Sequence, residues 1–350
     1  MADRSPKSVV LGPLAAALQV KSRKFEDGTE DRWLERTRKG GSLDSANALI
    51  ILRRCPINRS DEGVEFDDKP ILRWALEYNL GHRLPSGSGG LMQAAARRRH
   101  RAVQMLAESP GLHWAQVRLT VPDASPVLVG SGEAGVRDIG IALHGTYGWP
   151  ALPGSGLKGT THSYLRNELG RPEPELEELF GSPRPHPRTG GKGDAAGEPA
   201  GDGTGDADST EDPDQARTHN RGAVAFLDAV PDLDTGVAVS ADVLTPHVRE
   251  YYTGGSTGEP DTDSGDSQRK PPAEYWNPVP LPFLTVGSGG WVTHIVGTDA
   301  YAVRRAADAL VEAVDDIGVG AKTAAGYGYL KAEIVDGTVT EPASGEEAQQ

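Results

Sequence analysis

Three glycines beside a lysine form the first segment of this sequence that could do chemistry. In residues 152–170, Gly154, Gly156 and Gly159 surround Lys158. Glycines let backbone N–H groups approach an anion closely, and a helix that starts after them adds partial positive charge. We expect that helix to span residues 160–169, so that the glycines form a loop around a phosphodiester. The residues predicted to contact RNA here are Gly154, Ser155, Lys158, Gly159, His162 and Arg166.

A second glycine-rich segment, residues 318–330, reads GVGAKTAAGYGYL. A helix end followed by a tight turn would explain Gly318, but it would not explain four glycines around one lysine. We therefore interpret the segment as a flexible loop that presents backbone donors, with a tyrosine ring at its exit placed to stack on an unpaired base. The residues predicted to contact RNA here are Gly318, Gly320, Lys322, Thr323, Gly326 and Tyr327.

The two glycine-rich segments partly fit two known nucleotide-binding motifs, but neither segment matches its motif fully. The spacing of Gly154, Gly156 and Gly159 fits the dinucleotide fingerprint of an oxidoreductase, yet that fingerprint follows a buried strand and opens a βαβ unit. Here residues 147–150 (YGWP) precede the glycines. In the second segment, Ala321 stands where a phosphate-binding loop of nucleotide hydrolases needs glycine. The sequence thus predicts neither a bound cofactor nor a small-molecule substrate.

Two histidines are candidates for proton transfer in a metal-independent ribonuclease, which needs a general acid or base near phosphorus. His247 lies in a segment with two tyrosines, and His162 follows Lys158 by four residues. We favour a hydrogen-bonded role for His247 and an RNA contact for His162. Asp228 has no second carboxylate at a convincing spacing, and the nine histidines show no zinc spacing, so we expect no metal site and no enzyme.

The elements that would position these residues change type near residue 112. Helical patterns cover residues 42–54, 69–79, 91–108 and 299–316, and β-rich runs cover residues 114–121, 222–229, 280–286, 291–296 and 327–335. This order favours an α+β fold with a helix on an antiparallel sheet. We expect a mainly helical extension over residues 1–111, the principal domain over 112–340 and a disordered tail over 341–350.

Composition limits the possible partners of this 350-residue chain. With 44 glycines and 26 prolines, the sequence is unsuited to a compact helical bundle, and a net charge of −14 excludes a uniformly basic nucleic-acid binder. Most of that charge lies in residues 182–220, 253–275 and 331–350, and the first two read as disordered insertions. The rest is near neutral, so RNA binding stays possible. Residues 97–101 (RRRHR) form either a solvated helix face or a phosphate-facing patch.

One cysteine, Cys55, can form no internal disulfide, which is typical of a reducing compartment. Residues 9–20 are apolar but too short to span a bilayer, and no convincing signal-peptide cleavage site follows them. We therefore expect a cytoplasmic protein without a membrane partner.

Taken together, the segments resemble the CRISPR-associated RAMP superfamily. Residues 153–159 (PGSGLKG), followed by Arg166, resemble its first signature, and residues 318–328 resemble its C-terminal glycine-rich loop. Three further segments resemble one branch, the sixth subunits of type III-B (Cmr) effector complexes: residues 225–231, 242–252 and 277–286.

This resemblance implies a ferredoxin-like, RNA-recognition-type fold with an N-terminal extension. It also implies a non-catalytic subunit near the 3′ end of the guide RNA, with guide RNA, target RNA and other RAMP subunits of the Cmr complex as partners. A guide-processing endoribonuclease of the same superfamily is the alternative.

Overall fold

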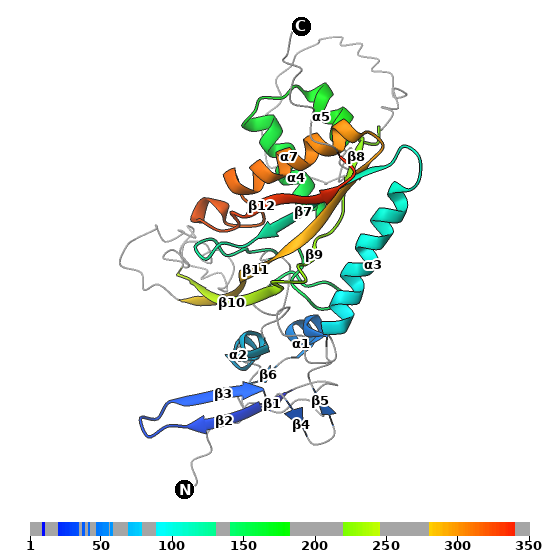
Figure 1. Ribbon diagram of the computed structural model, residues 1–350. Helices are drawn as coiled ribbons and strands as arrows, with labels where there is room; N and C mark the ends of the chain where they lie inside the picture. Colours follow the sequence, from blue (N-terminus) through cyan, green and yellow to red (C-terminus); the bar gives the residue numbers. More distant parts are fainter. Residues whose placement is uncertain are drawn as a thin grey trace, which may run out of the picture.

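The computed structural model describes eleven stretches of the chain and centres on one antiparallel sheet (Figure 1). The described residues are 9–10, 20–34, 37–38, 41–42, 47–55, 57–58, 69–78, 89–130, 141–182, 220–245 and 280–339. Helices together with antiparallel strands confirm the expected α+β class. The predicted insertions and tail lie almost entirely outside the described residues.

Four strands form the main path of the sheet, in the order β10 (Val237–Leu244), β11 (Leu281–Gly297), β7 (His113–Thr120) and β12 (Lys331–Gly337). Two short strands, β8 (Val224–Phe226) and β9 (Val230–Pro231), also pair with β11. Every pairing in this sheet is antiparallel. The strands thus predicted at 114–121, 222–229 and 327–335 are present with shifted ends.

Strand β11 is longer than the sequence indicated. Two separate runs were expected, at residues 280–286 and 291–296, but one 17-residue strand passes through the Gly-Ser-Gly-Gly sequence between them. At Gly290 an added Cβ would lie 2.2 Å from the Leu119 carbonyl oxygen of β7, so the close approach of two strands requires glycine there. The glycines therefore allow close strand pairing instead of ending the strand.

Helices α4 (Gly154–Asn167), α5 (Glu173–Phe180) and α7 (Ala300–Asp316) gather on one side of the sheet (Figure 1). Asp299 caps α7 by accepting hydrogen bonds from the backbone of Tyr301 and Ala302, as expected from its sequence. The buried stripe of α7, which includes Leu310, packs against the sheet. The element order from β7 to β12 is strand, helix, two strands, helix and strand, interrupted by α5, β8 and β9.

Helix α3 (Gly89–Ala107) lies against the other face of the sheet. Strand β7 alternates, so that Val117 and Leu119 are fully buried beneath the helices while Gln116 and Arg118 point to the opposite side. Helix α3 shares a pocket with the latter two residues. The same sheet is thus covered by several helices on one face and by one helix on the other.

Residues 1–111 hold more strands than expected. The three predicted helices are present as α1 (Ala48–Arg54), α2 (Lys69–Tyr78) and α3. They are joined by a hairpin of β2 (Val20–Lys24) and β3 (Glu30–Leu34). The remaining described strands there have two residues each: β1 (Val9–Val10), β4 (Thr37–Arg38), β5 (Gly41–Ser42) and β6 (Ile57–Asn58). The helices hold most of the residues described with regular structure in this region, and the strands were not expected, so a mainly helical extension stays a prediction.

One hydrophobic core joins the N-terminal region to the sheet. Leu34 of β3 and Ile71 of α2 belong to the same buried cluster as Leu310 and Leu330. Cys55 is fully buried in that cluster. The division into domains at residue 112 stays a prediction. Among the described residues, no helix is both long and apolar enough to cross a membrane.

Candidate nucleic-acid interface

Helix α4 begins at the first glycine of the first segment, six residues earlier than expected. Pro153 is its N-cap and makes no side-chain hydrogen bond. Instead, the Gly154 N–H donates to Oδ1 of Asp228 at 2.8 Å. Because an added Cβ at Gly154 would lie 2.4 Å from the Phe226 carbonyl oxygen, this glycine allows close packing within the protein. Its amide is bound by a carboxylate, so the expected amide contact with phosphate is not available from Gly154 in this structure.

The other two glycines of this segment lie in the first turns of α4 on open surface. Gly156 and Gly159 are exposed, and an added Cβ at either position would meet no atom within 4 Å. Ser155 beside them is exposed as well. A glycine inside a helix costs about 1 kcal/mol relative to alanine. Packing against the described residues does not account for these two glycines, whereas close approach by a partner would.

Three polar residues of α4 contact α5. The Lys158 ammonium donates to the carbonyl oxygen of Phe180 at 2.6 Å, where α5 ends. The His162 ring lies edge-on to the Phe180 ring, with 5.4 Å between centroids. Arg166 is exposed and lies 3.8 Å from a carboxylate oxygen of Glu173. Lys158 and His162 thus have structural contacts that the sequence did not reveal, and their contact with RNA stays a prediction.

The second glycine segment is fixed to the chain around residues 126–128. The Ala321 N–H donates to the Leu128 carbonyl and the Gly328 N–H donates to the Pro126 carbonyl. An added Cβ would lie 2.4 Å from a backbone oxygen at Gly320 and 2.0 Å from one at Gly328. Gly318 has a positive φ of 72°, which suits glycine where α7 ends. Backbone geometry therefore explains three of the four glycines, and the loop is less free than expected.

Gly320, Lys322 and residues 324–326 are the exposed positions of this loop. Among the described residues, Lys322 is the one residue other than glycine with a positive φ, 62°, which costs about 1 kcal/mol. Gly326 has a φ of 90° and open space around its Cα. Thr323, half-buried, begins the short 3-10 helix η2 (Thr323–Ala325). The turn therefore presents one ammonium group and an accessible backbone to the outside.

The Tyr327 ring faces protein rather than open surface. Its hydroxyl donates to Oδ2 of Asp242 at 2.5 Å, and its ring centroid lies 6.0 Å from that of Phe283. Burial, and then the hydrogen bond to Asp242, raise the pKa of Tyr327 to about 12. The bond to Asp242 fixes the position of the ring, and stacking of the ring on a base stays a prediction.

The two glycine segments are anchored on different parts of the sheet. The start of α4 contacts residues 226–228, whereas the loop contacts residues 126–128 and Asp242. Within the described chain, no hydrogen bond or ion pair joins the two segments. Their convergence on one RNA strand stays a prediction.

A pocket of about 290 Å³ beside the start of α4 was not foreseen. Its lining includes Arg98 and Arg99 of α3 and the rings of His144, Tyr147 and Trp149. The Tyr147 and Trp149 rings stack at 4.3 Å with 13° between their planes. Burial lowers the pKa of His144 below its ordinary value. Aromatic rings beside arginines are the groups that proteins use to bind single-stranded nucleic acid.

Asp228 connects this pocket to α4. Its carbonyl oxygen accepts a hydrogen bond from Arg99 at 2.7 Å, while its carboxylate accepts the bond from Gly154. Asp228 was considered above as a metal ligand. In the described part of the chain, no group of three or more His, Cys, Asp or Glu residues is placed to hold a metal ion. His247, the other catalytic candidate, lies outside the described residues.

Comparison with known families gives a direct match. The model of the RAMP superfamily matches residues 124–331, which is more than half of the chain and includes both glycine segments. The chain belongs to the RAMP superfamily. The family assigned from residues 153–159 and 318–328 is thereby confirmed.

Within RAMP proteins, the chain is similar to the CRISPR system Cmr subunit Cmr6 of Pyrococcus furiosus. The two are 27% identical over 230 residues, which is 59% of this chain and 65% of that protein, less than two thirds of the relative's length.

Two solved structures are also similar to this chain. One is a cryo-EM structure of the type III-B Cmr-beta complex bound to cognate target RNA, with 19% identity, 69% of this chain and 66% of that chain covered and a TM-score of 0.44. The other is the crystal structure of Cmr6 from Pyrococcus furiosus, with 23% identity, 64% and 99% coverage and a TM-score of 0.31.

Proposed function

We propose that this RAMP protein is a non-catalytic, RNA-binding structural subunit of a type III-B CRISPR (Cmr) ribonucleoprotein, corresponding to its sixth subunit. In this role it contacts the guide RNA towards the 3′ end, next to target RNA and other RAMP subunits. The observation that carries the proposal is the RAMP match over residues 124–331, together with the sequence similarity to Cmr6. The elements β7, α4, β10, β11, α7 and β12 then form the ferredoxin-like module of the family.

Surface chemistry near α4 supports binding of an RNA backbone. Gly156 and Gly159 leave open space on α4, and Arg98 and Arg99 line the aromatic pocket next to its first residue. Lys322 adds an exposed cation on the second loop. Contacts of this type bind phosphate and ribose without reading base sequence.

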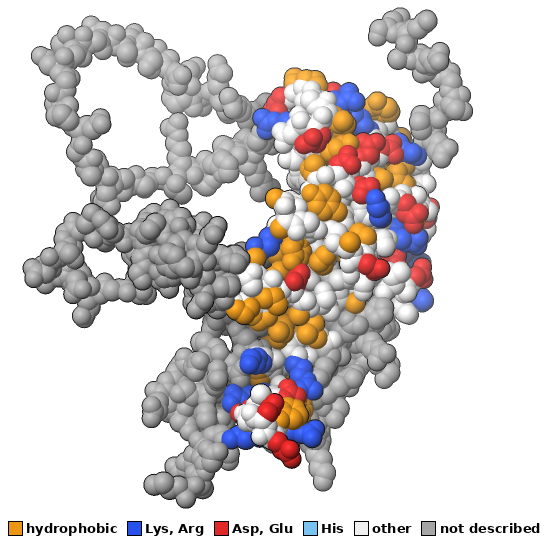
Figure 2. All heavy atoms as spheres, turned by 90° about the vertical axis from the view of Figure 1, so that its left-hand side faces the viewer, with side chains coloured by type: hydrophobic (Ala, Val, Ile, Leu, Met, Phe, Trp, Pro, Cys, Tyr) orange, Lys and Arg blue, Asp and Glu red, His pale blue; other side chains and the backbone are white. Residues whose placement is uncertain are grey.

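The edge of the sheet supports contact with neighbouring subunits. Strand β10 is an edge strand, and its last two residues, Val243 and Leu244, are 52% and 40% exposed. Figure 2 shows hydrophobic side chains gathered in the middle of this side of the molecule, between charged groups above and below. Exposed apolar groups at a sheet edge are typical of a surface that associates with another protein.

The catalytic alternative depends on His162 and His247. His162 contacts the Phe180 ring, and it lies on the side of α4 that faces α5. If the chain were a guide-processing ribonuclease, the purified protein would cleave repeat RNA in a chelator, and His247→Ala or His162→Ala would abolish the cleavage. We expect no cleavage by the wild type.

Binding of single-stranded RNA by the purified full chain tests the proposal. Lys322→Ala should weaken binding by about 1–3 kcal/mol, the usual worth of a charge-assisted hydrogen bond. Lys158→Ala should do the same, but its effect on α5 must be separated by a melting measurement, because Lys158 bonds to the end of that helix. Lys69→Ala on α2 removes an equal charge elsewhere and serves as the control. The Lys158→Ala, Lys322→Ala double variant would contradict the proposal if its affinity for RNA, and the dependence of that affinity on salt, were the same as those of the wild type.

A further inference from the structure

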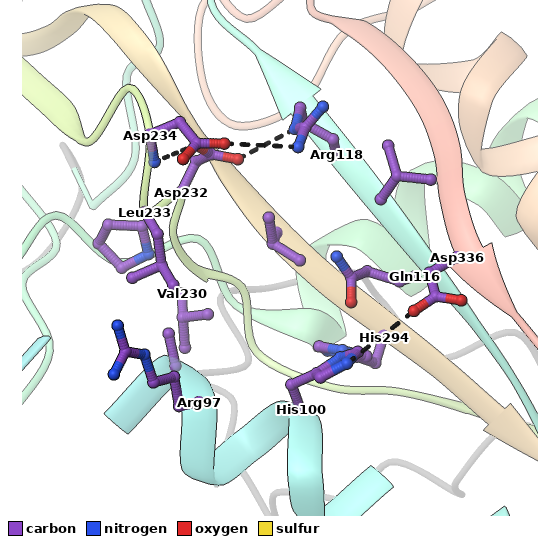
Figure 3. A pocket seen from close by; sticks show the side chains of 14 residues that line it. Arg97, His100, Gln116, Arg118, Val230, Asp232, Leu233, Asp234, His294 and Asp336 are labelled. Atoms are coloured by element: carbon purple, nitrogen blue, oxygen red, sulfur yellow. Dashed lines mark hydrogen bonds and ion pairs between the residues drawn. The ribbon is translucent and has the colours of Figure 1, made fainter. Parts of the chain in front are cut away.

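A second pocket, of about 400 Å³, lies between α3 and the face of the sheet that α7 does not cover (Figure 3). Its floor is formed by β7, β11 and β12, and its near wall by Ala96 and His100 of α3. Val230 and Val292 supply apolar surface beside these polar groups. The volume is within the range of sites that bind small organic groups.

Three polar side chains form a row across the floor of this pocket. In the strand register, Gln116 of β7 lies opposite His294 of β11 on one side and opposite Asp336 of β12 on the other. All three line the pocket, as Figure 3 shows. Neighbouring strands are about 4.8 Å apart, so the row spans about 10 Å.

The row has hydrogen-bonding capacity that the protein does not use. His294 is 1% exposed, and neither of its ring nitrogens has a hydrogen-bond partner within the described chain. The same holds for Nδ1 of His100, whose ring centroid is 5.9 Å from that of His294. No described residue hydrogen bonds to the side-chain amide of Gln116. Unused polar groups in a pocket are evidence for a ligand that satisfies them.

The ring of His294 is neutral at ordinary pH. Burial, and then the nearby positive charge of Arg99 and His100, lower the pKa of His294 to about 4. A neutral imidazole has one donor and one acceptor, and the Gln116 amide also offers both. Asp336 is an acceptor at the end of the row; its Oδ1 accepts from the Gly337 N–H at 2.8 Å, and its Oδ2 lies 3.9 Å from Nε2 of His100 (Figure 3). The row thus suits a flat group that carries donors and acceptors along one edge.

Two arginines line this pocket, and they differ in whether a carboxylate pairs with them. Arg118 is neutralised by Asp232 at 3.0 Å and by Glu333 at 3.1 Å. Arg97, midway along α3, is exposed and lines the pocket, and no ion pair to it exists among the described residues. One cation at the mouth is therefore available to an anionic group of a ligand.

We propose that this pocket binds a single unpaired nucleotide of single-stranded RNA, with its base on the row of Asp336, Gln116 and His294 and its phosphate at Arg97. The inference rests on the proposed function and names where one base of the RNA is held. A nucleobase has apolar faces that fit against Val230 and Val292, and its edge carries the donors and acceptors that the row requires. The pocket is distinct from the aromatic pocket beside α4, which is lined by other residues of α3, although Val230 lines both.

The test compares two substitutions on the same face of β7. Gln116→Leu removes the central hydrogen-bonding group, whereas Thr120→Leu changes an exposed residue outside the pocket lining. The affinity of the full chain for a single-stranded RNA oligonucleotide is measured over a range of salt concentrations. We expect Gln116→Leu to weaken binding about tenfold without changing the salt dependence, because it removes base contacts and no charge. Thr120→Leu should bind as the wild type does.

A second variant separates a binding effect from a folding effect. Arg97→Ala alters an exposed side chain, and it should weaken binding and reduce the slope of log affinity against log salt by about 0.7, the value for one phosphate contact. If the wild type binds RNA but both Gln116→Leu and Arg97→Ala bind equally well, the pocket assignment is wrong and the proposed function stands. If the wild type binds no single-stranded RNA even at low salt, the proposed function itself is contradicted and this inference falls with it.

Discussion

Gly328 and Gly156 belong to the two glycine-rich segments of the chain, and they differ in what surrounds them. An added Cβ at Gly328 would lie 2.0 Å from the Val319 carbonyl oxygen, while one at Gly156 would meet nothing within 4 Å. Gly328 also has a φ of 82°, whereas Gly156 lies inside a helix. The first glycine is required by the fold of its own loop. No described residue packs against the second, and we propose that a partner does.

This difference separates glycines that the fold requires from glycines that we propose contact a partner. In the second segment, folding explains Gly318, Gly320 and Gly328, whereas it does not explain the exposed Lys322 and Gly326. In the first segment, folding explains Gly154 alone. The glycines of these two segments thus meet two different requirements, and each requirement can be tested by adding one methyl group.

The largest effect is expected from Gly328→Ala. The new methyl group would overlap a backbone oxygen in a conformation that alanine rarely adopts, so the free energy of unfolding should fall by about 3 kcal/mol. Gly326→Ala has a similar φ but open space, and should lose about 1 kcal/mol. Denaturant unfolding of both variants measures the difference. Equal losses of unfolding free energy in the two variants would mean that the close contact between Gly328 and Val319 does not stabilise the loop.

Removing the arginines beside α4 should affect RNA binding next most strongly. The double variant Arg98→Ala, Arg99→Ala should bind single-stranded RNA at least tenfold more weakly, with a salt slope reduced by about 1.4 for two lost phosphate contacts. The control removes two cations that are already paired with carboxylates, Arg304 with Asp308 and Lys331 with Asp315. If both double variants lose the same affinity, the effect is one of net charge and the pocket beside α4 is not an RNA contact.

Alkaline pH should weaken the loop through Tyr327. Its pKa is raised from about 10 to about 12 in the folded protein, so the stabilisation is complete below pH 10 and is lost as the pH rises towards 12. Relative to Tyr327→Phe, the wild type should therefore lose about 1 kcal/mol over that interval. Tyrosinate absorbance measures the pKa of Tyr327, and denaturant unfolding measures the loss of stability. Ionisation of Tyr327 near pH 10 would show that its bond to Asp242 does not form.

The smallest change in stability has the opposite sign. Gly156→Ala and Gly159→Ala should each stabilise the protein by about 0.5–1 kcal/mol, because alanine favours a helix and meets no obstacle. The same substitutions should weaken RNA binding, since a methyl group would then occupy the surface that the partner approaches. Melting temperature and RNA affinity should thus move in opposite directions. A stabilised variant with unchanged affinity for RNA would show that Gly156 and Gly159 do not leave space for an RNA partner.

Local sequence signals were sufficient for the elements that end at clear caps. Helix α7 was expected at residues 299–316 and spans Ala300–Asp316, because Asp299 caps its start and Gly318 follows its end. The helices at 69–79 and 91–108 were also placed within two residues. Periodicity and capping act within a few residues, so a single sequence contains them.

Distant contacts determined what the sequence did not reveal. Helix α4 begins at Gly154 because Asp228, 74 residues later, bonds to its first amide. Strand β11 continues through its glycines because β7 and β10 pair with it on both sides. The row of Gln116, His294 and Asp336 comes from three strands far apart in the chain. Such sites follow from strand register, which the local pattern does not contain.

Purification of the tagged chain from its host tests the central claim most directly. Bound RNA is sequenced, and co-purifying proteins are identified. The account predicts short RNAs derived from CRISPR repeats and spacers, together with several other RAMP proteins. Recovery of the intact chain without RNA and without any RAMP partner would contradict it.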